Sequence, residues 1–334
     1  MRTLATIQEI FGIDPIKDSD YLELAHVLGW GCVVKKGTFR VGDRAVYFEV
    51  DSFLPVDERY EFLRKTSFRE NPDNGAGFRI KTLRLRGQLS QGLLLPLSDF
   101  PELEGATLGD DVTEALGIKK WYMPEVGTGS GTAIGGRPHG IPASDETRIQ
   151  SAPELLSRLR GEPYYITTKM DGTSGIVYCI DGKIGCCSRN YEIKDEVDAL
   201  YWAAVYKYGL KEKLAALGKN VVLTGEICGP AIQKNKLRLA EYEWYVFDYK
   251  DWDTGTYIPY AEMVERCDAL GVPTVPLEED GEAFDYSLEQ LLEMAKGKYP
   301  SGLEKEGIVV RHKNEPHKIS FKVLNNEALL KEKD

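Results

Sequence analysis

Residues 166–172, Ile-Thr-Thr-Lys-Met-Asp-Gly, constrain the fold of this 334-residue chain more than any other stretch. They place Lys169 at the end of a predicted strand, with Asp171 two positions later and Gly172 directly after it. Because strand side chains alternate with a period of two, the ammonium group and the carboxylate are expected to share one face. An amine nucleophile beside a carboxylate that attracts a metal ion suits covalent transfer of a nucleotide.

Five further motifs follow this one along the chain, and they matter because a four-residue match alone arises often by chance. They are Cys187-Ser-Arg-Asn190, Leu223-Thr-Gly-Glu226, Trp244-Tyr-Val-Phe247, Glu306-Gly-Ile-Val-Val310 and Ile319-Ser-Phe-Lys322. The ordered set resembles the covalent nucleotidyltransferase superfamily of ATP-dependent ligases and mRNA capping enzymes. Within it, the chain resembles the nick-sealing RNA ligases with an amino-terminal OB domain, RNA ligase family 5, to which Lys35–Arg44 and Asp51–Pro55 are also similar.

The amino-terminal part of the chain has the pattern of a small all-β barrel. Short alternating stretches between turn residues predict strands at Leu22–Val27, Gly31–Lys35, Ala45–Val50, Arg79–Leu85 and Gly92–Pro96. About five strands in roughly 100 residues fit an OB-type barrel, and they fit other small barrels equally well. The resemblance implies the OB fold, so residues 1–118 are expected to form a nucleic-acid-binding OB domain.

Residues 119–145 have the composition of a Gly/Pro-rich linker. The run Gly127–Gly136 is followed by Pro138 and Pro142, which indicates a flexible connection between two domains. A phosphate-binding loop is the alternative, but the run lacks the Gly-Lys-Ser/Thr ending of a P-loop. We therefore expect a linker.

Residues 146–334 mix helix and strand patterns without strict alternation, which indicates an α+β domain with mainly antiparallel sheets. Strands are predicted at Tyr164–Lys169, Ser174–Ile180, Lys183–Ser188, Val221–Ile227, Trp244–Tyr249 and Gly307–Arg311. Helices are predicted at Ala152–Leu159, at Val197–Leu217 with a break at Gly209, and at Tyr286–Met294. The resemblance implies that this part is the nucleotidyltransferase (adenylation) domain.

The overall composition, with 42% hydrophobic and 28% charged residues, is ordinary for a soluble protein. No apolar run approaches the ~18 residues of a membrane span, and the first residues lack a secretory signal. We expect a cytoplasmic monomer with no membrane partner. The six cysteines show no paired metal-ligand spacing and are expected to be reduced thiols, several of them on buried strands.

The charge distribution bears on nucleic acid as a partner. A net charge of −11 argues mildly against it, since nonspecific affinity comes from neutralising phosphates. One basic run argues the other way: Arg79 and Lys81 are expected to share one strand face, and Arg84 and Arg86, in another stretch, share a parity with each other. A basic strand of this kind can hold backbone phosphates. The alternative is a solvated edge strand protected by its charge.

Lys169 is the predicted nucleophile, whose amine attacks the α-phosphate of ATP and releases pyrophosphate. An amine with an ordinary pKa of ~10.4 is mostly protonated at neutral pH, so desolvation or a divalent cation must favour its neutral form. Asp171, Glu226 and Glu306 are predicted to hold Mg²⁺ or Mn²⁺, chiefly through water. The resemblance also implies a contact of Glu226 with the ribose hydroxyls. Solvated surface charges are the alternative for all four side chains.

Three further side chains are candidates for binding ATP or the nucleic acid. Arg189 offers a planar guanidinium to ribose or phosphate oxygens, and Phe247 offers a flat apolar face to adenine. Arg148 is a candidate for binding the incoming 5′-phosphate. Surface ion pairs are the alternative for the two arginines, and a core position is the alternative for Phe247. Trp244 and Tyr245 are expected in the core.

Lys322 is predicted to neutralise the α-phosphate as charge develops on it. The superfamily usually has two lysines two positions apart at this point, whereas this chain has Ser320 at the first position. Lys318 is the candidate substitute. Twelve residues follow Lys322, so we expect no downstream OB domain of the kind that most DNA ligases and capping enzymes carry.

The sequence therefore predicts an ATP-dependent RNA ligase that joins 3′-hydroxyl and 5′-phosphate ends, at nicks, through lysyl-AMP and an adenylylated 5′ end. An ATP-dependent DNA ligase and a GTP-dependent capping enzyme are alternatives that the domain order disfavours. A non-catalytic nucleic-acid-binding module is the third alternative. The presence of Lys169, Glu226, Glu306 and Lys322 together argues against it.

Overall fold

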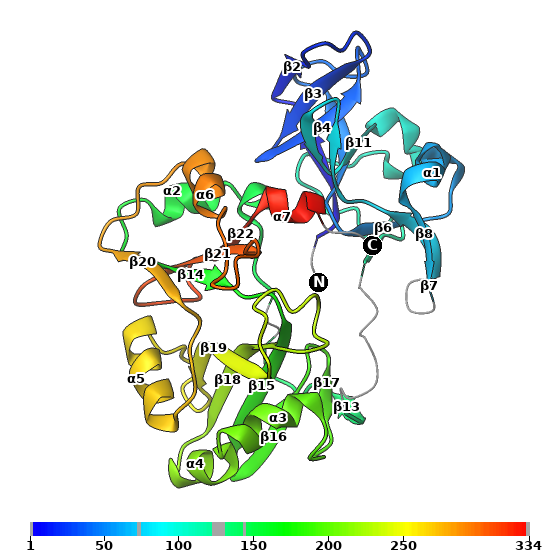
Figure 1. Ribbon diagram of the computed structural model, residues 1–334. Coiled ribbons are helices and arrows are strands. Elements are labelled where there is room, and N and C mark those ends of the chain that lie inside the picture. The colour runs from blue at the N-terminus through cyan, green and yellow to red at the C-terminus, as the bar shows by residue number, and fades with distance from the viewer. Residues whose placement is uncertain (1–2, 72–74, 122–130, 143–144, 332–334) are drawn as a thin grey trace. The chain divides into compact units, whose positions relative to one another are not determined.

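The computed structural model describes residues 3–71, 75–121, 131–142 and 145–331. The chain divides into two compact units, Met1–Glu125 and Val126–Lys331 (Figure 1). None of the helices in the described ranges is long and apolar enough to cross a membrane.

The amino-terminal unit is built mainly from short antiparallel strands. In pairing order its sheets are β1 (Ala5–Glu9), β5 (Arg44–Phe48) and β11 (Leu93–Pro96); β2 (Gly12–Pro15), β3 (Leu22–Val27) and β4 (Trp30–Lys35); β12 (Lys119–Lys120), β6 (Ser52–Pro55), β8 (Gly75–Arg79) and β7 (Phe68–Asn71); and β10 (Gln88–Gln91) with β9 (Thr82–Leu85). Its helical segments are α1 (Arg64–Ser67) and the 3-10 turns η1 (Glu58–Leu63), η2 (Leu97–Asp99) and η3 (Pro101–Leu103). Alternate strand residues bury two apolar cores, one around Phe48 and Phe78 and the other around Trp30 and Tyr47.

Four of the strands predicted in this unit are confirmed, as β3, β4, β5 and β11. The fifth prediction, a continuous strand over 79–85, is wrong, because β8 ends at Arg79 and β9 begins at Thr82 in a different sheet. The basic run therefore does not form a single strand. Arg86 lies in the turn between β9 and β10, where it adopts a left-handed conformation (φ 49°).

The predicted linker, residues 119–145, contains paired segments where it is described. β12 pairs with β6, and β13 (Ala133–Gly136) pairs with β17 (Tyr191–Ile193). Arg137 also donates a hydrogen bond to the carbonyl oxygen of Ile141 at 2.7 Å. The part of the glycine run from Ala133 to Gly136 is therefore an edge strand of the carboxy-terminal unit. Residues 122–130, which include the start of the glycine run, lie outside the described residues.

A six-stranded antiparallel sheet forms one half of the carboxy-terminal unit (Figure 1). Its strand order is β13, β17, β16 (Lys183–Cys187), β15 (Thr173–Ile180), β18 (Val221–Cys228) and β19 (Glu243–Asp251). Three helices bury their apolar residues against it: α3 (Leu200–Lys207), α4 (Leu210–Ala216) and α5 (Tyr260–Leu270). Trp202 and Leu223 belong to this core.

A four-stranded antiparallel sheet forms the other half. Its order is β20 (Leu277–Gly281), β14 (Tyr164–Lys169), β21 (Gly307–His312) and β22 (Ser320–Leu324). The helices α2 (Glu154–Leu159) and α6 (Leu288–Met294) pack on it through a second apolar core around Phe284 and Phe321. The 3-10 turn η4 (Ile149–Ser151) precedes α2, and α7 (Asn326–Lys331) follows β22.

The predictions for this unit are largely confirmed. All six predicted strands are present with small differences at their ends, and the helix predicted over 197–217 is broken at Gly209, whose φ of 62° is left-handed. The prediction missed α5, which buries only Met263, Cys267 and Leu270 and is polar elsewhere. The six cysteines are free and all of them are buried, whereas the sequence placed only several of them on buried strands.

Candidate active site

The motif around Lys169 carries the chain from one sheet to the other. β14 ends at Lys169 in the four-stranded sheet, and β15 begins at Thr173 in the six-stranded sheet. The crossing passes so close to β18 that a Cβ atom on Gly172 would lie 2.3 Å from the backbone oxygen of Ile227. Only glycine fits there, and its place after Asp171 therefore follows from the geometry.

A second glycine allows the same approach on the other side of the site. Gly307 follows Glu306 at the start of β21, opposite Lys169 in the strand register. A Cβ atom on Gly307 would lie 2.1 Å from the backbone oxygen of Val323. The glycine therefore lets β21 approach β22 closely, and the pairing of β21 with β14 places Glu306 beside the lysine.

Lys169 and the three predicted carboxylates are brought together. The Lys169 Nζ lies 2.9 Å from Glu306 Oε1, and both side chains are 23% exposed. Glu226, on β18, and Asp171 also act electrostatically on the lysine. A second lysine of the group is Lys236, whose Nζ lies 3.5 Å from Asp171 Oδ1.

The pKa values of Lys169 and its neighbouring carboxylates are shifted because these charged groups lie close together in a partly buried site. Burial tends to lower the pKa of Lys169, but the charges of Glu306, Glu226 and Asp171 outweigh burial and raise it above its ordinary value. Burial and the neighbouring carboxylates raise the pKa of Glu226 to about 7, although Lys169 opposes that shift. Burial, followed by the charge of Glu306, also raises the pKa of Asp171. Without a further cation, the amine of Lys169 is held protonated.

One of the carboxylates offers an unsatisfied oxygen to a cation. Within the described ranges there is no group of three or more His, Cys, Asp and Glu side chains that could hold a metal ion on its own. Asp171, however, buries its Oδ2 atom without a hydrogen-bond partner among the described residues. A buried, unsatisfied carboxylate oxygen is costly, and a hydrated cation would satisfy it.

Tyr299 holds the lysine strand and the glutamate strand together, and sequence reasoning missed it. Its hydroxyl donates to the backbone oxygen of Lys169 at 2.6 Å and accepts from the backbone N–H of Glu306 at 3.1 Å. Burial raises the pKa of this phenol well above its ordinary value. The hydroxyl therefore remains protonated and can donate its hydrogen bond.

Residues 145–148 bring the predicted arginines and Lys322 to one segment. Asp145 Oδ1 lies 2.8 Å from Arg189 Nη2 and 3.3 Å from Lys322 Nζ. The backbone N–H of Lys322 donates to the oxygen of Thr147 at 2.8 Å, and Arg148 is buried next to β22. Asp145 was not predicted, although a carboxylate three residues before Arg148 was visible in the sequence.

Lys318 does not join this group. It pairs with Glu315 at 3.0 Å, and its side chain is half exposed. The physical reason is that β22 begins only at Ser320, so the strand alternation that orients Ser320 and Lys322 does not extend back to Lys318.

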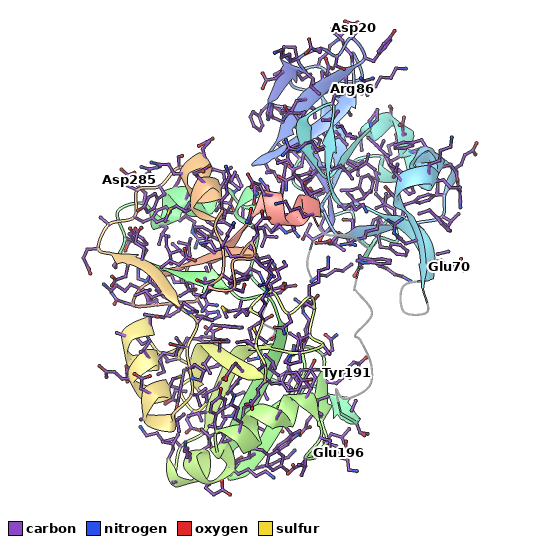
Figure 2. All side chains as sticks on the ribbon, viewed as in Figure 1. Asp20, Glu70, Arg86, Tyr191, Glu196 and Asp285 are labelled. Atoms are coloured by element: carbon purple, nitrogen blue, oxygen red, sulfur yellow. The ribbon has the colours of Figure 1, made fainter. Side chains whose placement is uncertain are left out.

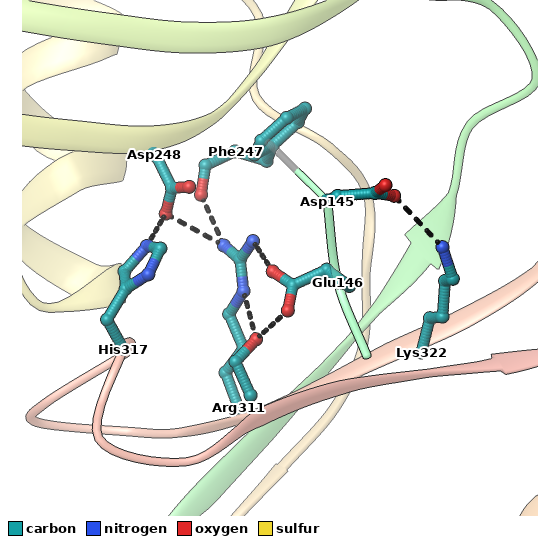
Figure 3. A network of polar contacts seen from close by, with 8 residues as sticks. Asp145, Glu146, Phe247, Asp248, Arg311, His317 and Lys322 are labelled. Carbon is teal, nitrogen blue, oxygen red and sulfur yellow. Dashed lines mark hydrogen bonds and ion pairs between the residues drawn. The ribbon is translucent and has the colours of Figure 1, made fainter. Parts of the chain in front are cut away.

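A buried arginine network supports Phe247, the predicted adenine-stacking residue (Figure 3). Arg311 Nη1 donates to the backbone oxygen of Phe247 at 2.6 Å and to Asp248 Oδ1 at 3.0 Å. Its Nη2 and Nε donate to Glu146 Oε1 at 2.6 Å and Ser320 Oγ at 3.1 Å. Ser320, which stands where the superfamily usually has a lysine, is thus part of the same network.

The aromatic residues around Phe247 differ in role. Phe247 is partly buried and groups with Met170, Cys228 and Val275. Both Trp244 and Tyr245 were expected in the core. Trp244 is fully buried in the core of the six-stranded sheet, whereas Tyr245 packs with the smaller group around Phe247. Arg311 was also missed, although a charged residue directly after the apolar Ile308-Val-Val310 run signals a buried, paired cation.

We expect Arg311→Met to destabilise the protein by about 3–5 kcal/mol, because it removes the guanidinium that pairs with the buried carboxylate of Asp248 and the partly buried carboxylate of Glu146. The free energy of unfolding in a denaturant titration measures this. Lys313→Met is the matched control, since Lys313 pairs with Asp280 and Glu282 nearer the surface and is expected to cost about 1 kcal/mol or less. Equal stability of the two variants would contradict the role given to Arg311.

The basic residues of the amino-terminal unit fall into two groups. Arg79 is largely buried, pairs with Asp51 at 3.3 Å, and packs over the ring of Trp121. Lys81 is partly buried. Arg84 and Arg86 are exposed at the tip of the β9–β10 hairpin, and Arg86 is labelled in Figure 2. Of these four residues, only Arg84 and Arg86 are exposed to solvent.

Known protein families match both the amino-terminal and the carboxy-terminal unit. Residues 4–97 match an OB-fold domain family, and residues 162–324 match the RNA ligase family. No curated protein matches the chain. Among solved structures, the chain is similar to Naegleria gruberi RNA ligase. It is 38% identical to an apo variant of that enzyme over 99% of each chain, with a TM-score of 0.93. It is 39% identical to a variant solved with AMP and Mn over 100% of each chain, with a TM-score of 0.94. A further variant of that enzyme, solved with ATP and Mn, is 39% identical over 98% of this chain and 99% of its own, with a TM-score of 0.93.

These matches confirm the predicted fold, an amino-terminal OB-fold domain followed by an α+β domain of antiparallel sheets. The likeness extends over nearly the whole length of both proteins. The chain therefore belongs to the RNA ligase family.

Proposed function

We propose that this protein is an ATP-dependent RNA ligase that seals nicks by way of lysyl-AMP on Lys169. Membership of the RNA ligase family makes it an enzyme that acts on nucleic acid. The observation that carries the proposal is the ion pair of Lys169 with Glu306 beside two further carboxylates, in a chain similar throughout to an RNA ligase solved with ATP and Mn.

Three steps make up the proposed reaction. The amine of Lys169 attacks the α-phosphorus of ATP; a P–N bond forms, the bond to the β-phosphate bridge breaks, and pyrophosphate leaves. The AMP then passes to the 5′-phosphate of the nucleic acid, which frees the lysine. Finally the 3′-hydroxyl attacks that activated phosphate, and AMP leaves as the phosphodiester forms. RNA is favoured, at least on the 3′-hydroxyl side.

The carboxylates of Asp171, Glu226 and Glu306 would hold Mg²⁺ or Mn²⁺, mainly through water. When bound, the cation neutralises their charge, so that they no longer hold the amine of Lys169 protonated, and it stabilises charge on the phosphate. The side chains of this chain set the geometry: Tyr299 fixes the backbone of Lys169 relative to Glu306 and so limits the positions that the amine can take.

Five further side chains have proposed roles, four in binding and one in positioning. Phe247 stacks on adenine, Arg189 binds ribose or phosphate oxygens, and Lys322 neutralises the α-phosphate. Asp145 pairs with both cations and so keeps them near each other before ATP arrives. Arg148, buried beside β22, is the proposed ligand of the incoming 5′-phosphate.

A substrate panel tests this proposal. Duplexes with a single nick, containing RNA or DNA on either side of the break, are incubated with the protein, Mg²⁺ and either ATP or GTP. We expect joining with ATP when the 3′-hydroxyl end is RNA and little joining with GTP. Equal joining of all-DNA nicks would support a DNA ligase, and labelling of the protein with GTP alone would support a capping enzyme.

The exposed hairpin arginines are proposed to contact backbone phosphates of the nucleic acid. The expected effect of Arg84→Ala with Arg86→Ala is weaker binding of nicked RNA and a salt dependence, log Kd against log salt, that is shallower by about 1–2. Self-labelling with ATP should remain at the wild-type rate. Lys65→Ala, an exposed cation on α1, is the matched control. An unchanged salt dependence in the double variant would remove the hairpin from the nucleic-acid surface.

A further inference from the structure

Lys236 is a lysine of the active-site cluster that the proposed mechanism does not use. It lies in the segment 229–239 between β18 and β19, and its Nζ is 3.5 Å from Asp171 Oδ1. The two side chains are only 14% and 11% exposed. A lysine is seldom buried to this extent unless a partner compensates its charge, and its partner here is a proposed metal-facing carboxylate.

The backbone of this segment is fixed tightly enough to aim the side chain. It takes left-handed conformations at four non-glycine residues, Ala231, Gln233, Asn235 and Arg238. The Asn235 amide group closes the segment on Leu239 with two hydrogen bonds of 3.0 and 3.1 Å. Strained conformations of this kind persist only where surrounding contacts hold them, and they concentrate at functional sites.

Two further contacts tie the same segment to the site. The hydroxyl of Ser301 donates to the backbone oxygen of Lys236, and Gln233 Nε2 donates to the oxygen of Gly172 at 3.4 Å. Leu237 and Leu239 pack with the apolar group that contains Phe247. The position of Lys236 is therefore coupled to the motif that carries Lys169 and Asp171, and to the proposed adenine site.

Two ion pairs between lysines and carboxylates lie side by side in the site. Lys169 pairs with Glu306, and Lys236 pairs with Asp171. A divalent cation at these carboxylates would meet two ammonium groups at short range, where like charges repel strongly because the surroundings are partly buried. Lys169 must stay as the nucleophile, so Lys236 is the cation that can give up its place.

We propose that Lys236 is a built-in competitor of the divalent metal ion for Asp171. Its ammonium group neutralises Asp171 while the site is empty, and it leaves that carboxylate when the hydrated ion and ATP bind. The triphosphate is the anion that can receive it. This inference rests on the proposed function, because it takes Asp171 as one of the residues that face the metal ion.

The test is the affinity of the nucleotide-free protein for Mn²⁺, measured by the electron paramagnetic resonance signal of the free ion. Removal of the competing charge in Lys236→Met should tighten Mn²⁺ binding by about tenfold or more, and Lys236→Gln, which is closer to lysine in polarity, should do the same. Lys234→Met, an exposed lysine of the same segment, should change nothing. Circular dichroism confirms that each variant is folded.

Asp171→Asn, alone and combined with Lys236→Met, separates failure of this inference from failure of the proposed function. We expect Asp171→Asn to weaken Mn²⁺ binding and to cancel the gain of Lys236→Met. If Asp171→Asn weakens binding but neither Lys236 variant tightens it, the competitor role alone is overturned. A gain that survives in the double variant overturns it as well. If Asp171→Asn leaves Mn²⁺ binding unchanged in both the wild-type protein and the Lys236→Met variant, Asp171 does not face the metal ion. The competitor role of Lys236 and the metal-binding role of Asp171 in the proposed function then both fail.

Discussion

Lys169→Ala is expected to abolish covalent labelling of the protein by ATP completely. The amine of Lys169 is the only proposed point of attachment for AMP, and its neighbours Glu306, Glu226 and Asp171 are carboxylates that cannot form the same P–N bond. The measurement is incubation with ATP labelled at the α-phosphate, followed by a denaturing gel. Nicked RNA that already carries AMP on its 5′-phosphate should still be joined, although more slowly.

The control for this experiment is Lys183→Ala. Lys183 is an exposed lysine that begins β16 and pairs with Glu192, so its loss should leave labelling at the wild-type level. Thermal unfolding of both variants excludes a general loss of structure. Persistent labelling of a folded Lys169→Ala protein would contradict the assignment of the nucleophile.

Glu306→Ala and Asp171→Ala are each expected to slow self-labelling by about a hundredfold or more, with a much smaller loss of ATP binding. The reason is that a group used to stabilise charge during the reaction lowers the chemical step selectively. Single-turnover labelling at saturating ATP measures the rate, and equilibrium binding of ATP measures the affinity. Higher Mg²⁺ or Mn²⁺ should recover part of the rate.

Glu293→Ala serves as the matched control, because Glu293 is exposed on α6 and pairs with Lys296. It should react at the wild-type rate at every metal concentration. The metal assignment fails if Glu306→Ala and Asp171→Ala behave like this control and do not respond to added metal. A loss of ATP binding equal to the loss of rate would instead assign the two carboxylates to binding alone.

The sequence predicted the elements well where a run of strand-forming residues stays within a single sheet. β3 and β14 have the predicted boundaries. Alternating burial misled the prediction over 79–85, because Phe78, Ile80 and Thr82 are all buried although the chain changes sheets between β8 and β9. Alternation indicates which side of the chain is covered. It carries no information about which strand lies beside it.

In the candidate site, the sequence predicted the residues that stand in motifs and missed the residues that hold them. The sequence predicted Lys169, Asp171, Glu226 and Glu306 as one group because each stands in a short motif, and the fold brings them together. It did not predict the side chains that hold the group in place. Arg311 reaches Phe247 and Lys236 reaches Asp171 across more than 60 residues of chain. Such pairings depend on how the two sheets meet and leave no local pattern.

The central claim, that AMP is carried by Lys169, is tested most directly by locating the nucleotide on the protein. The wild-type protein is incubated with ATP and Mg²⁺ without nucleic acid, digested, and examined by tandem mass spectrometry. We predict a single adenylylated peptide that contains residues 166–172, with AMP on Lys169, and its disappearance when pyrophosphate is added. AMP on any other residue, or a protein that joins nicked RNA with ATP while carrying no AMP, would contradict the account.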